Sequence, residues 1–460
     1  MKENSCLQKQ LVVIGNLIAV AGVSTLLISA RPRTNYVAHE WGTFTSVQGG
    51  DGVLLDWRPL ETSRLPEFVY DWRHPGLNRQ AVGNLGFGKI AMLTLQRMET
   101  PVIYFYSDKE QTLDVSVQFP RGLITEWYPQ AAQIGPSTVP VPPAIAKLDN
   151  YAHKVGVQPG FTFASLLSNH SLKESGVRWA NIEILPGKQH PDLANALPLA
   201  RSGSHYFAAR DTDSAYLRVS SLVATNPSPE QEKFLFYRGV GNFGTPLRVT
   251  MISEDSVFLA NTGKEPLEHL FVLQLRDRAG QFMYVDRLAP GEQRSVAVDS
   301  GASTTRVETL SRQLGERMAA ALVKAGLYQR EAKAMINTWT DSWFQEEGVR
   351  VLYVLPRAWT DRTLPLKLDP APGELTRVMV GRTEVIVPRV QQTLADTLTK
   401  ASEGDPLARE QALAEFRKLG RFGEPALRLA TKGANAAVNQ IAWTLLQAAA
   451  AKPANVTKAF

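Results

Sequence analysis

Cysteine is almost absent from this 460-residue sequence, and its scarcity excludes several chemistries. The single thiol belongs to Cys6, which lies ahead of the first apolar run. The chain after it therefore has no disulfide framework, no thiolate nucleophile and no cysteine-ligated zinc site. A body without cysteine suits an oxidising compartment.

Runs of basic residues are also missing. The net charge of +6 arises from 50 basic and 44 acidic residues, and the two signs are interspersed along the chain. Without a block of Lys and Arg that would follow a phosphate backbone, this balance is typical of a solvated surface. We therefore expect no nucleic acid among the partners of this protein.

Several common active-site motifs do not occur. The sequence has no Gly-x-x-x-x-Gly-Lys-Ser/Thr loop, no His-Glu-x-x-His, no Gly-x-Ser-x-Gly and no EF-hand loop. None of the seven histidines is paired at a metal-ligand spacing; they are His39, His74, His153, His170, His190, His205 and His269. We therefore predict neither a bound metal nor a cofactor.

Residues 11–30 form the first long apolar run, LVVIGNLIAVAGVSTLLISA, which is uncharged and follows Lys2 and Lys9. A helix of about 20 apolar residues is just long enough to span a bilayer. A basic start, an apolar centre and small residues near the end are also the layout of a secretory leader. We predict that residues 1–34 are either a signal peptide or a retained anchor in inner-membrane lipid. Both alternatives export the body, which is then periplasmic or tethered to the inner membrane outside the cytoplasm.

The stretch from 96 to 128 predicts the centre of the fold. It has the pattern of three consecutive strands, dense in β-branched and aromatic residues, between irregular flanks. Pro101, within the first of these strands, indicates an edge strand, a bulge or a break. We expect residues 35–245 to form a β-rich body with long loops, built as an antiparallel β-sandwich.

Residues 246–302 have the most regular pattern. Five short strand-like segments follow one another, and turns such as Asn-Thr-Gly-Lys and Ala-Pro-Gly-Glu separate the later ones. This spacing is typical of a β-sandwich, so we predict an immunoglobulin-like β module at about 246–300.

The pattern changes to a helical period after residue 302. Residues 303–388 predict a helical hairpin followed by returning strands. Residues 389–460 predict a helical C-terminal segment that resembles a short HEAT-like stack. The predicted class is mainly β with an α-helical C-terminal part, that is, a multidomain α+β protein.

Ionisable side chains interrupt the apolar strand runs, and they supply the candidate site. Arg97 and Glu99 are two positions apart, so they point to the same face of one strand. Because a buried charge is costly unless it is paired, such residues either meet one another or face a cleft. The candidates are His39, Glu40, Arg97, Glu99, Glu126, Asp211 and Arg238.

Three interpretations of these residues stay open. In the first, which we favour, Arg97 or Arg238 neutralises Glu99 or Glu126 within an internal ion-pair network. In the second, Glu99 and Glu126 are catalytic, as general acid and base together with His39. Hydrolases of sugars or peptides need such a pair, because the acid and the base must flank one bond. The groove for this reaction would be lined by Trp41, Trp57 and Trp127.

The third interpretation is a binding groove without catalysis, which uses the same aromatic residues and arginines. The residues assigned to binding are Glu40, Trp41, Trp57, Arg97, Trp127, Asp211 and Arg238.

Two long stretches resemble the signatures of an uncharacterised family of bacterial proteins. They are His39-Glu-Trp-Gly-Thr-Phe-Thr-Ser46 and Arg97-Met-Glu-Thr-Pro-Val-Ile-Tyr-Phe-Tyr-Ser107. The resemblance extends over most of residues 36–388, and members of the family are predicted to be exported or membrane-anchored. It implies the same location for this chain, but no activity, substrate or catalytic residue.

These observations lead to two hypotheses about function. The first is a binding or scaffolding protein of the cell envelope, with an envelope protein or a glycan as partner. The helical segment from residue 389 favours it, because stacked helices offer surfaces to partners. The alternative is an extracytoplasmic hydrolase of glycans or peptides that uses paired carboxylates.

Overall fold

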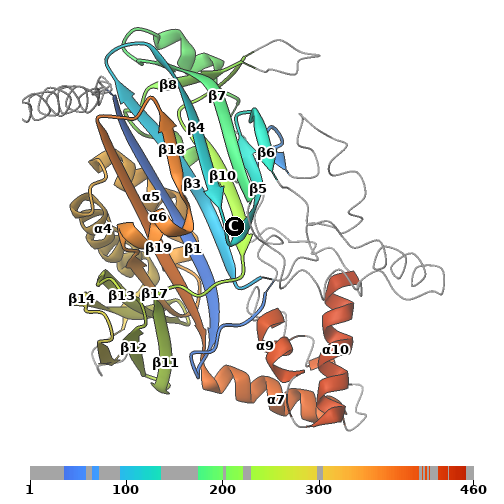
Figure 1. Ribbon diagram of the computed structural model, residues 1–460. Coiled ribbons are helices and arrows are strands. Elements are labelled where there is room, and N and C mark those ends of the chain that lie inside the picture. The colour runs from blue at the N-terminus through green and yellow to red at the C-terminus, as the bar shows by residue number, and fades with distance from the viewer. Residues whose placement is uncertain are drawn as a thin grey trace, which may run out of the picture.

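The computed structural model describes residues 36–57, 65–71, 94–135, 175–199, 204–220, 229–297, 304–402, 423–431, 433 and 435–451, together with residues 407, 410, 411 and 414. The predicted leader at 11–30 lies outside these residues. Within the described ranges, no helix is long and apolar enough to cross a membrane. The protein has a mixed α and β structure that consists mainly of sheets and ends in helices, as the sequence predicts (Figure 1).

A ten-stranded sheet forms the centre of the molecule, in the order β16, β14, β13, β17, β19, β1, β3, β10, β5 and β2. The bounds of its strands are β1 Tyr36–Gly49, β2 Tyr70–Asp71, β3 Gln96–Ser107, β5 Gly122–Tyr128, β10 Leu235–Gly241, β13 Leu267–Arg276, β14 Ala279–Leu288, β16 Thr305–Arg306, β17 Gly348–Val354 and β19 Glu374–Ile386. The three strands predicted between residues 96 and 128 are confirmed. Two of them, β3 and β5, belong to this sheet, and the strand between them belongs to a second one.

The middle of this sheet is a parallel pair, β1 beside β19. Val37 lies opposite Glu374, and the register continues without a shift to Gly49 opposite Ile386. The neighbouring pairs β1–β3 and β17–β19 are antiparallel, so the expected antiparallel body is corrected at the β1–β19 pairing. Parallel strands cannot be joined by a tight hairpin, and here residues 50–373 form the connection.

A six-stranded sheet packs on one face of the ten-stranded sheet. Its order is β18, β4, β7, β8 and β9, and β6 also pairs with β7. The bounds are β4 Gln111–Phe119, β6 Gln133–Gly135, β7 Ser175–Leu185, β8 Tyr216–Val219, β9 Glu230–Glu232 and β18 Leu366–Asp369. Buried side chains of both sheets, such as Phe44 in β1 and Trp179 in β7, belong to one apolar cluster.

A three-stranded sheet corrects the module predicted over 246–302. It contains β11 Leu247–Ser253, β12 Ser256–Asn261 and β15 Gln293–Ala297. All five predicted strands are present, but β13 and β14 pair within the ten-stranded sheet, where β13 also pairs with β17. These residues therefore do not form a self-contained module. Regular spacing predicts hairpins between sequential strands, but it does not specify the long-range partner that completes a sheet.

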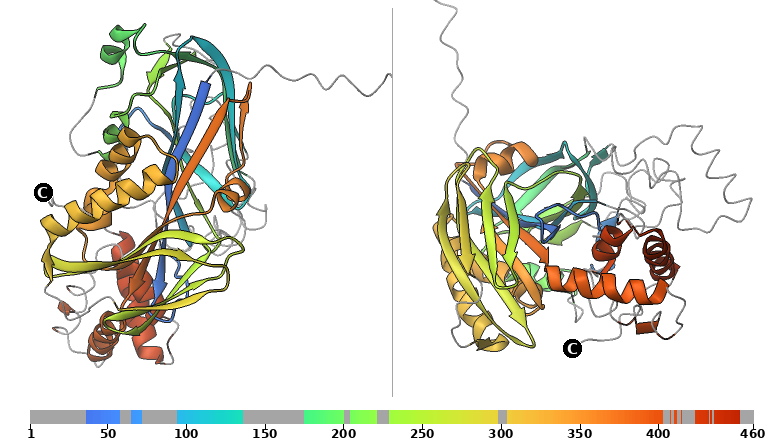
Figure 2. Two further views of the ribbon diagram at one scale, coloured as in Figure 1. Left: turned by 90° about the vertical axis from the view of Figure 1, so that its left-hand side faces the viewer. Right: turned by 90° about the horizontal axis from the view of Figure 1, so that it is seen from below.

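Most helices cover the opposite face and one end of the ten-stranded sheet (Figure 2). The exception is α6, Arg357–Thr363, which lies on the face of the six-stranded sheet, where its Trp359 packs against Phe44 of β1. The bounds of the helices are α4 Val307–Lys324, α5 Gln329–Phe344, α6 Arg357–Thr363, α7 Pro388–Ser402, α9 Gly423–Ala430 and α10 Ala436–Ala451, with the 3-10 helices η3 Pro191–Ala196 and η4 His205–Arg210. Leu314 of α4 and Trp343 of α5 share an apolar cluster with Trp41 of β1. The helices α7, α9 and α10 form another cluster with Val47 and Ile386. Helices are thus present in both segments where the sequence predicts them.

A bulge interrupts β3 at Pro101, which is one of the three outcomes expected there. The register between β1 and β3 shifts between Trp41 and Thr43. Thr100 has a positive φ of 40° at this point. Gly42 makes room for the proline, because a Cβ at Gly42 would lie 2.9 Å from Pro101 Cα. The bulge lets a proline, which has no N–H to donate, stand within a central strand.

Gly239 of β10 generates a test of this packing. A Cβ there would lie 2.4 Å from the carbonyl oxygen of Leu123. We predict that Gly239→Ala lowers the free energy of unfolding by about 1–3 kcal/mol, because overpacking forces the backbone to shift. Urea titration followed by circular dichroism measures this change. The control is Gly244→Ala, whose Cβ would make an ordinary 3.5 Å contact with Leu54, and equal losses in the two variants would contradict the prediction.

Candidate functional site

A band of polar and charged side chains crosses the helix-covered face of the ten-stranded sheet. It extends over six neighbouring strands, from β17 to β5, and each member is buried. We call it the polar band, and its members are Thr43, Thr45, Arg97, Glu99, Glu126, Arg238, Arg350, Arg382 and Glu384. Because charged residues are almost never fully buried unless they are paired, this band is the feature of the fold that most needs an explanation.

The strand register aligns the polar band in rows. Thr45 lies opposite Arg97 on one side and opposite Arg382 on the other. In the next row, Thr43 lies opposite Glu99. Arg97 and Glu99 therefore share one face of β3, as their spacing predicts.

The polar band separates two apolar clusters. Trp41, two residues before Thr43, packs with α4 and α5. Val47, two residues after Thr45, packs with the C-terminal helices. Because residues two apart in a strand share a face, one face of β1 passes from apolar to polar and back to apolar.

Each carboxylate proposed for catalysis is held by an arginine. Arg238 donates to Glu126 twice, from Nη2 to Oε1 at 2.6 Å and from Nε to Oε2 at 2.8 Å. Arg97 Nε lies 3.3 Å from Glu99 Oε1. Strand β10, with Arg238, lies between β3 and β5, so the backbones of Glu99 and Glu126 are two strand spacings, about 10 Å, apart. These contacts agree with the first interpretation, in which Arg97 or Arg238 neutralises Glu99 or Glu126.

Arg350 and Arg382 share one buried carboxylate near the end of α5. Arg350 Nε donates to Glu384 Oε2 at 3.1 Å, and Arg382 Nε donates to Oε1 at 2.5 Å. Arg350 also donates to the carbonyl oxygen of Trp343, where a cation offsets the partial negative charge of the helix end. Burial lowers the pKa of Arg350, while Glu384 opposes this effect and Arg382 adds to it. The polar band thus connects α5 to the sheet.

His39 does not join the carboxylates of the polar band. Its Nδ1 lies 2.7 Å from Glu331 Oε2 in α5, and Tyr106 donates to Glu331 Oε1 at 2.7 Å. Burial, and next the Glu331 carboxylate, raise the pKa of Tyr106, which is therefore a neutral donor. His39 is four residues from Thr43, the residue opposite Glu99, a distance of about 13 Å along the strand. The three residues proposed for catalysis thus lie in separate contacts.

Glu40 lies on the other face of β1 from His39, because consecutive strand residues alternate. Its Oε1 accepts a 2.5 Å hydrogen bond from the hydroxyl of Tyr237, and its Oε2 accepts one from Arg377 Nε, also at 2.5 Å. Arg377 donates further to Asp361 at 2.8 Å. Burial, followed by the charge of Glu40, raises the pKa of Tyr237. Glu40 is therefore the centre of a second buried network, between the two larger sheets.

The three tryptophans assigned to a groove do not line a common one. Trp41 packs under α4 and α5, Trp57 packs with the C-terminal helices, and Trp127 packs in the cluster between the sheets. Each is at most 1% exposed. Trp127 directly follows Glu126, so the two side chains point to opposite faces of β5. The predicted aromatic groove is therefore corrected to three separate core contacts.

Asp211 lies at the surface, at 62% exposure, and forms an ion pair with Arg330 of α5. Arg330 also pairs with Asp213. Exposed pairs of this kind contribute about 0–1 kcal/mol. Asp211 is thus not brought together with the buried candidates.

Sequence reasoning missed several residues of these networks. Arg350, Arg382 and Glu384 stand within apolar strand runs, which is the same signal that identified Arg97 and Glu99. Glu331 has no such signal, because a glutamate in the first turn of a helix is common. Among the described residues, no group of three or more His, Cys, Asp or Glu side chains could hold a metal ion.

Comparison with known proteins adds little to this description. No family model and no curated protein matches the chain. Among solved structures, the yeast delta-COP-I mu-homology domain complexed with a Dsl1 WxWxV peptide has a TM-score of 0.23 and 7% identity, covering 77% of this chain and 98% of that chain. The yeast delta-COP-I mu-homology domain alone has the same TM-score and identity, with 78% and 99% covered. Similarity at this level does not establish a shared fold.

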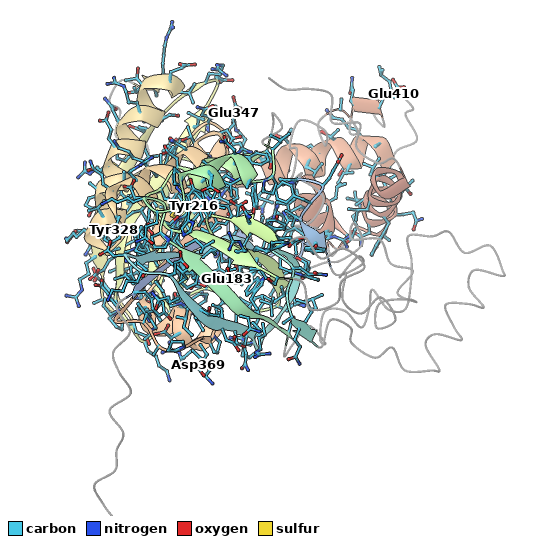
Figure 3. All side chains as sticks on the ribbon, turned by 90° about the horizontal axis from the view of Figure 1, so that it is seen from above. Glu183, Tyr216, Tyr328, Glu347, Asp369 and Glu410 are labelled. Carbon is cyan, nitrogen blue, oxygen red and sulfur yellow. The ribbon has the colours of Figure 1, made fainter. Side chains whose placement is uncertain are left out.

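The Glu126–Arg238 pair generates a test of the ion-pair interpretation. We predict that Glu126→Gln lowers the free energy of unfolding by about 3–5 kcal/mol, because it removes the carboxylate that neutralises a buried guanidinium. The control is Glu183→Gln in β7 (Figure 3). Its partner Arg218 is 31% exposed, so this substitution should cost no more than about 1 kcal/mol. Urea titration of both variants measures the difference. Unchanged stability in Glu126→Gln would contradict a structural role.

Proposed function

We propose that the protein is a binding or scaffolding protein of the cell envelope, exported or tethered to the inner membrane. The observation that carries this proposal is that the residues proposed for catalysis are buried and paired. Glu99 and Glu126 are 2% and 1% exposed, and each is in contact with an arginine. Location outside the cytoplasm is proposed from residues 11–30 and from the resemblance to exported proteins.

The buried ion pairs weaken the hydrolase hypothesis. A general acid or base must come within hydrogen-bond reach of a substrate atom, and its pKa must suit proton transfer near the working pH. Both carboxylate oxygens of Glu126 accept a hydrogen bond from Arg238, so this carboxylate faces a guanidinium inside the core and not an open cleft. It is therefore poorly suited to donate or accept a proton during turnover. We keep the hydrolase only as an outcome of the tests below.

The C-terminal helices support a binding role. In the proposal, α7, α9 and α10 act as a short HEAT-like stack that offers a surface to a partner. They pack on their own apolar cluster, which leaves Trp443 of α10 at 41% exposure. The proposed partner is an envelope protein or a glycan, and lipid contacts residues 11–30 if that segment is retained.

The proposed location has a direct test. We predict that alkaline phosphatase fused after Phe460 is active in cells, because this enzyme works only outside the cytoplasm. A matched fusion that lacks residues 11–30 should be inactive. Fractionation then separates a retained anchor, found with membranes, from a cleaved leader, found in the soluble periplasm. Equal phosphatase activity with and without residues 11–30 would contradict export by this segment.

Binding and hydrolysis are separated by one set of assays on the full-length protein. We predict retention of a defined envelope protein or glycan in pull-downs and on glycan arrays, with no release of sugars or peptides from cell-wall material. Purified envelope fractions provide the material for both assays. Release that is lost in Glu126→Gln, while that variant unfolds at the same urea concentration as the wild type, would overturn the proposal in favour of the hydrolase.

A further inference from the structure

Outside the Arg97–Glu99 ion pair, three polar atoms of the polar band have no hydrogen-bond partner within the described part of the chain. They are Thr43 Oγ1, Thr45 Oγ1 and Arg382 Nη1. All three side chains are fully buried. Leaving a buried donor or acceptor unsatisfied costs about 1–3 kcal/mol for each group, and native proteins keep few of them. Three such groups on two adjacent strands therefore call for a physical explanation.

The register brings these atoms to one place. Thr45 of β1 is the Cα partner of Arg382 in β19, and Thr43 is two residues away on the same face. Adjacent strands are about 4.8 Å apart, so the threonine hydroxyls and the arginine side chain begin from neighbouring points of the sheet. Arg97 lies opposite Thr45 on the other side, which places a second guanidinium next to the same row.

The local charge is not balanced within the buried region. Arg350 and Arg382 carry two positive charges, and both contact the buried carboxylate of Glu384. The second carboxylate in contact with Arg382 belongs to Glu346, which is 40% exposed and accepts from Nη2 at 3.0 Å. Solvent screens that carboxylate, so the buried arginines have one positive charge more than their buried partner neutralises. One further negative charge would be stabilised here.

We propose that Thr43, Thr45 and Arg382 form a binding site for the carboxylate of a small monoanionic ligand. Arg382 Nη1 donates to one carboxylate oxygen, and the two threonine hydroxyls donate to the oxygens from the β1 side. Arginine suits this role, because its guanidinium has donors on three nitrogens: Nε and Nη2 bind Glu384 and Glu346, and Nη1 is left for the ligand. The contact from Arg382 to the half-exposed Glu346 indicates the side from which the ligand enters.

The surplus of one charge selects a carboxylate over a dianionic phosphate or sulfate. A dianion would replace one excess positive charge with one excess negative charge, and an unbalanced buried charge of either sign is costly. Glu99 and Glu384 are also buried in the polar band and repel a second negative charge. A monoanion neutralises the site without this penalty.

Thermal unfolding of the full-length protein in matched salts tests the proposal. We expect sodium acetate to raise Tm by roughly 2–5 °C above sodium chloride of the same ionic strength, because a ligand that binds only the native state stabilises it. Phosphate and sulfate at that ionic strength should raise Tm less. Thr45→Val should abolish the acetate effect and fold at least as well without ligand, because it removes a hydroxyl that has no partner in the described chain.

Two further variants keep the test decisive. Arg382→Lys keeps the charge but removes Nη1, the donor assigned to the ligand, so it should also lose the acetate effect. Thr383→Val is the matched control: it is buried in the same strand but points to the opposite face, and it should keep the full effect. An equal acetate effect in the wild type and in Thr45→Val, or none in the wild type, would overturn the site. A larger effect of phosphate than of acetate would overturn the carboxylate assignment.

Discussion

The parallel pairing of β1 with β19 is the constraint on which the other parts of the structure depend. It joins residues 36–49 to residues 374–386 through thirteen aligned positions, so the sheet is complete only after most of the chain has been added. The entropy lost when such a long loop closes grows only slowly with its length. Burial of apolar surface by the sheet can therefore offset it. The six-stranded sheet covers one face of this pair, α4 and α5 cover the other, and α7 begins two residues after β19 ends. Each layer is therefore positioned by this one pairing.

The same pairing explains why buried charge can exist on both faces of the sheet. On one face Glu40 of β1 meets Arg377 of β19, and on the other face Arg382 and Glu384 of β19 meet each other beside Thr45 of β1. A slip of one residue between β1 and β19 would turn every side chain of one strand to the opposite face. If β19 turned over, Arg377 would lose Glu40, and Arg382 and Glu384 would together leave Arg350 of β17 without its buried carboxylate. A wrong register therefore costs more free energy with these charges than with apolar residues in their place. Buried ion pairs contribute little net stability, but here they make the correct register specific.

The sequence alone predicts the elements well and their partners poorly. The strands in 96–128 and 246–300, an irregularity at Pro101 and the helices after residue 302 follow from local patterns of side chains. The pairing of Glu126 with Arg238 is compatible with the burial argument, but the spacing of the residues does not specify it. The contact between His39 and Glu331 joins residues 292 positions apart, and no local pattern contains that information. The supposed tryptophan groove fails for a simpler reason, since the alternation of a strand already separates Trp127 from Glu126.

The need to fix the strand register explains why some members of the polar band are buried, but not why all of them are. Glu126 and Arg238 satisfy each other through two hydrogen bonds, so the specification of register is a sufficient explanation for that pair. Thr43, Thr45 and Arg382 Nη1 are different, because register would be specified equally well by valines and by a guanidinium with all its donors satisfied. Replacing an unsatisfied buried group with an apolar one of the same shape is neutral or stabilising in general. These three groups therefore weaken the isolated fold without making it more specific, and a bound anion is the explanation that gives their position a physical benefit.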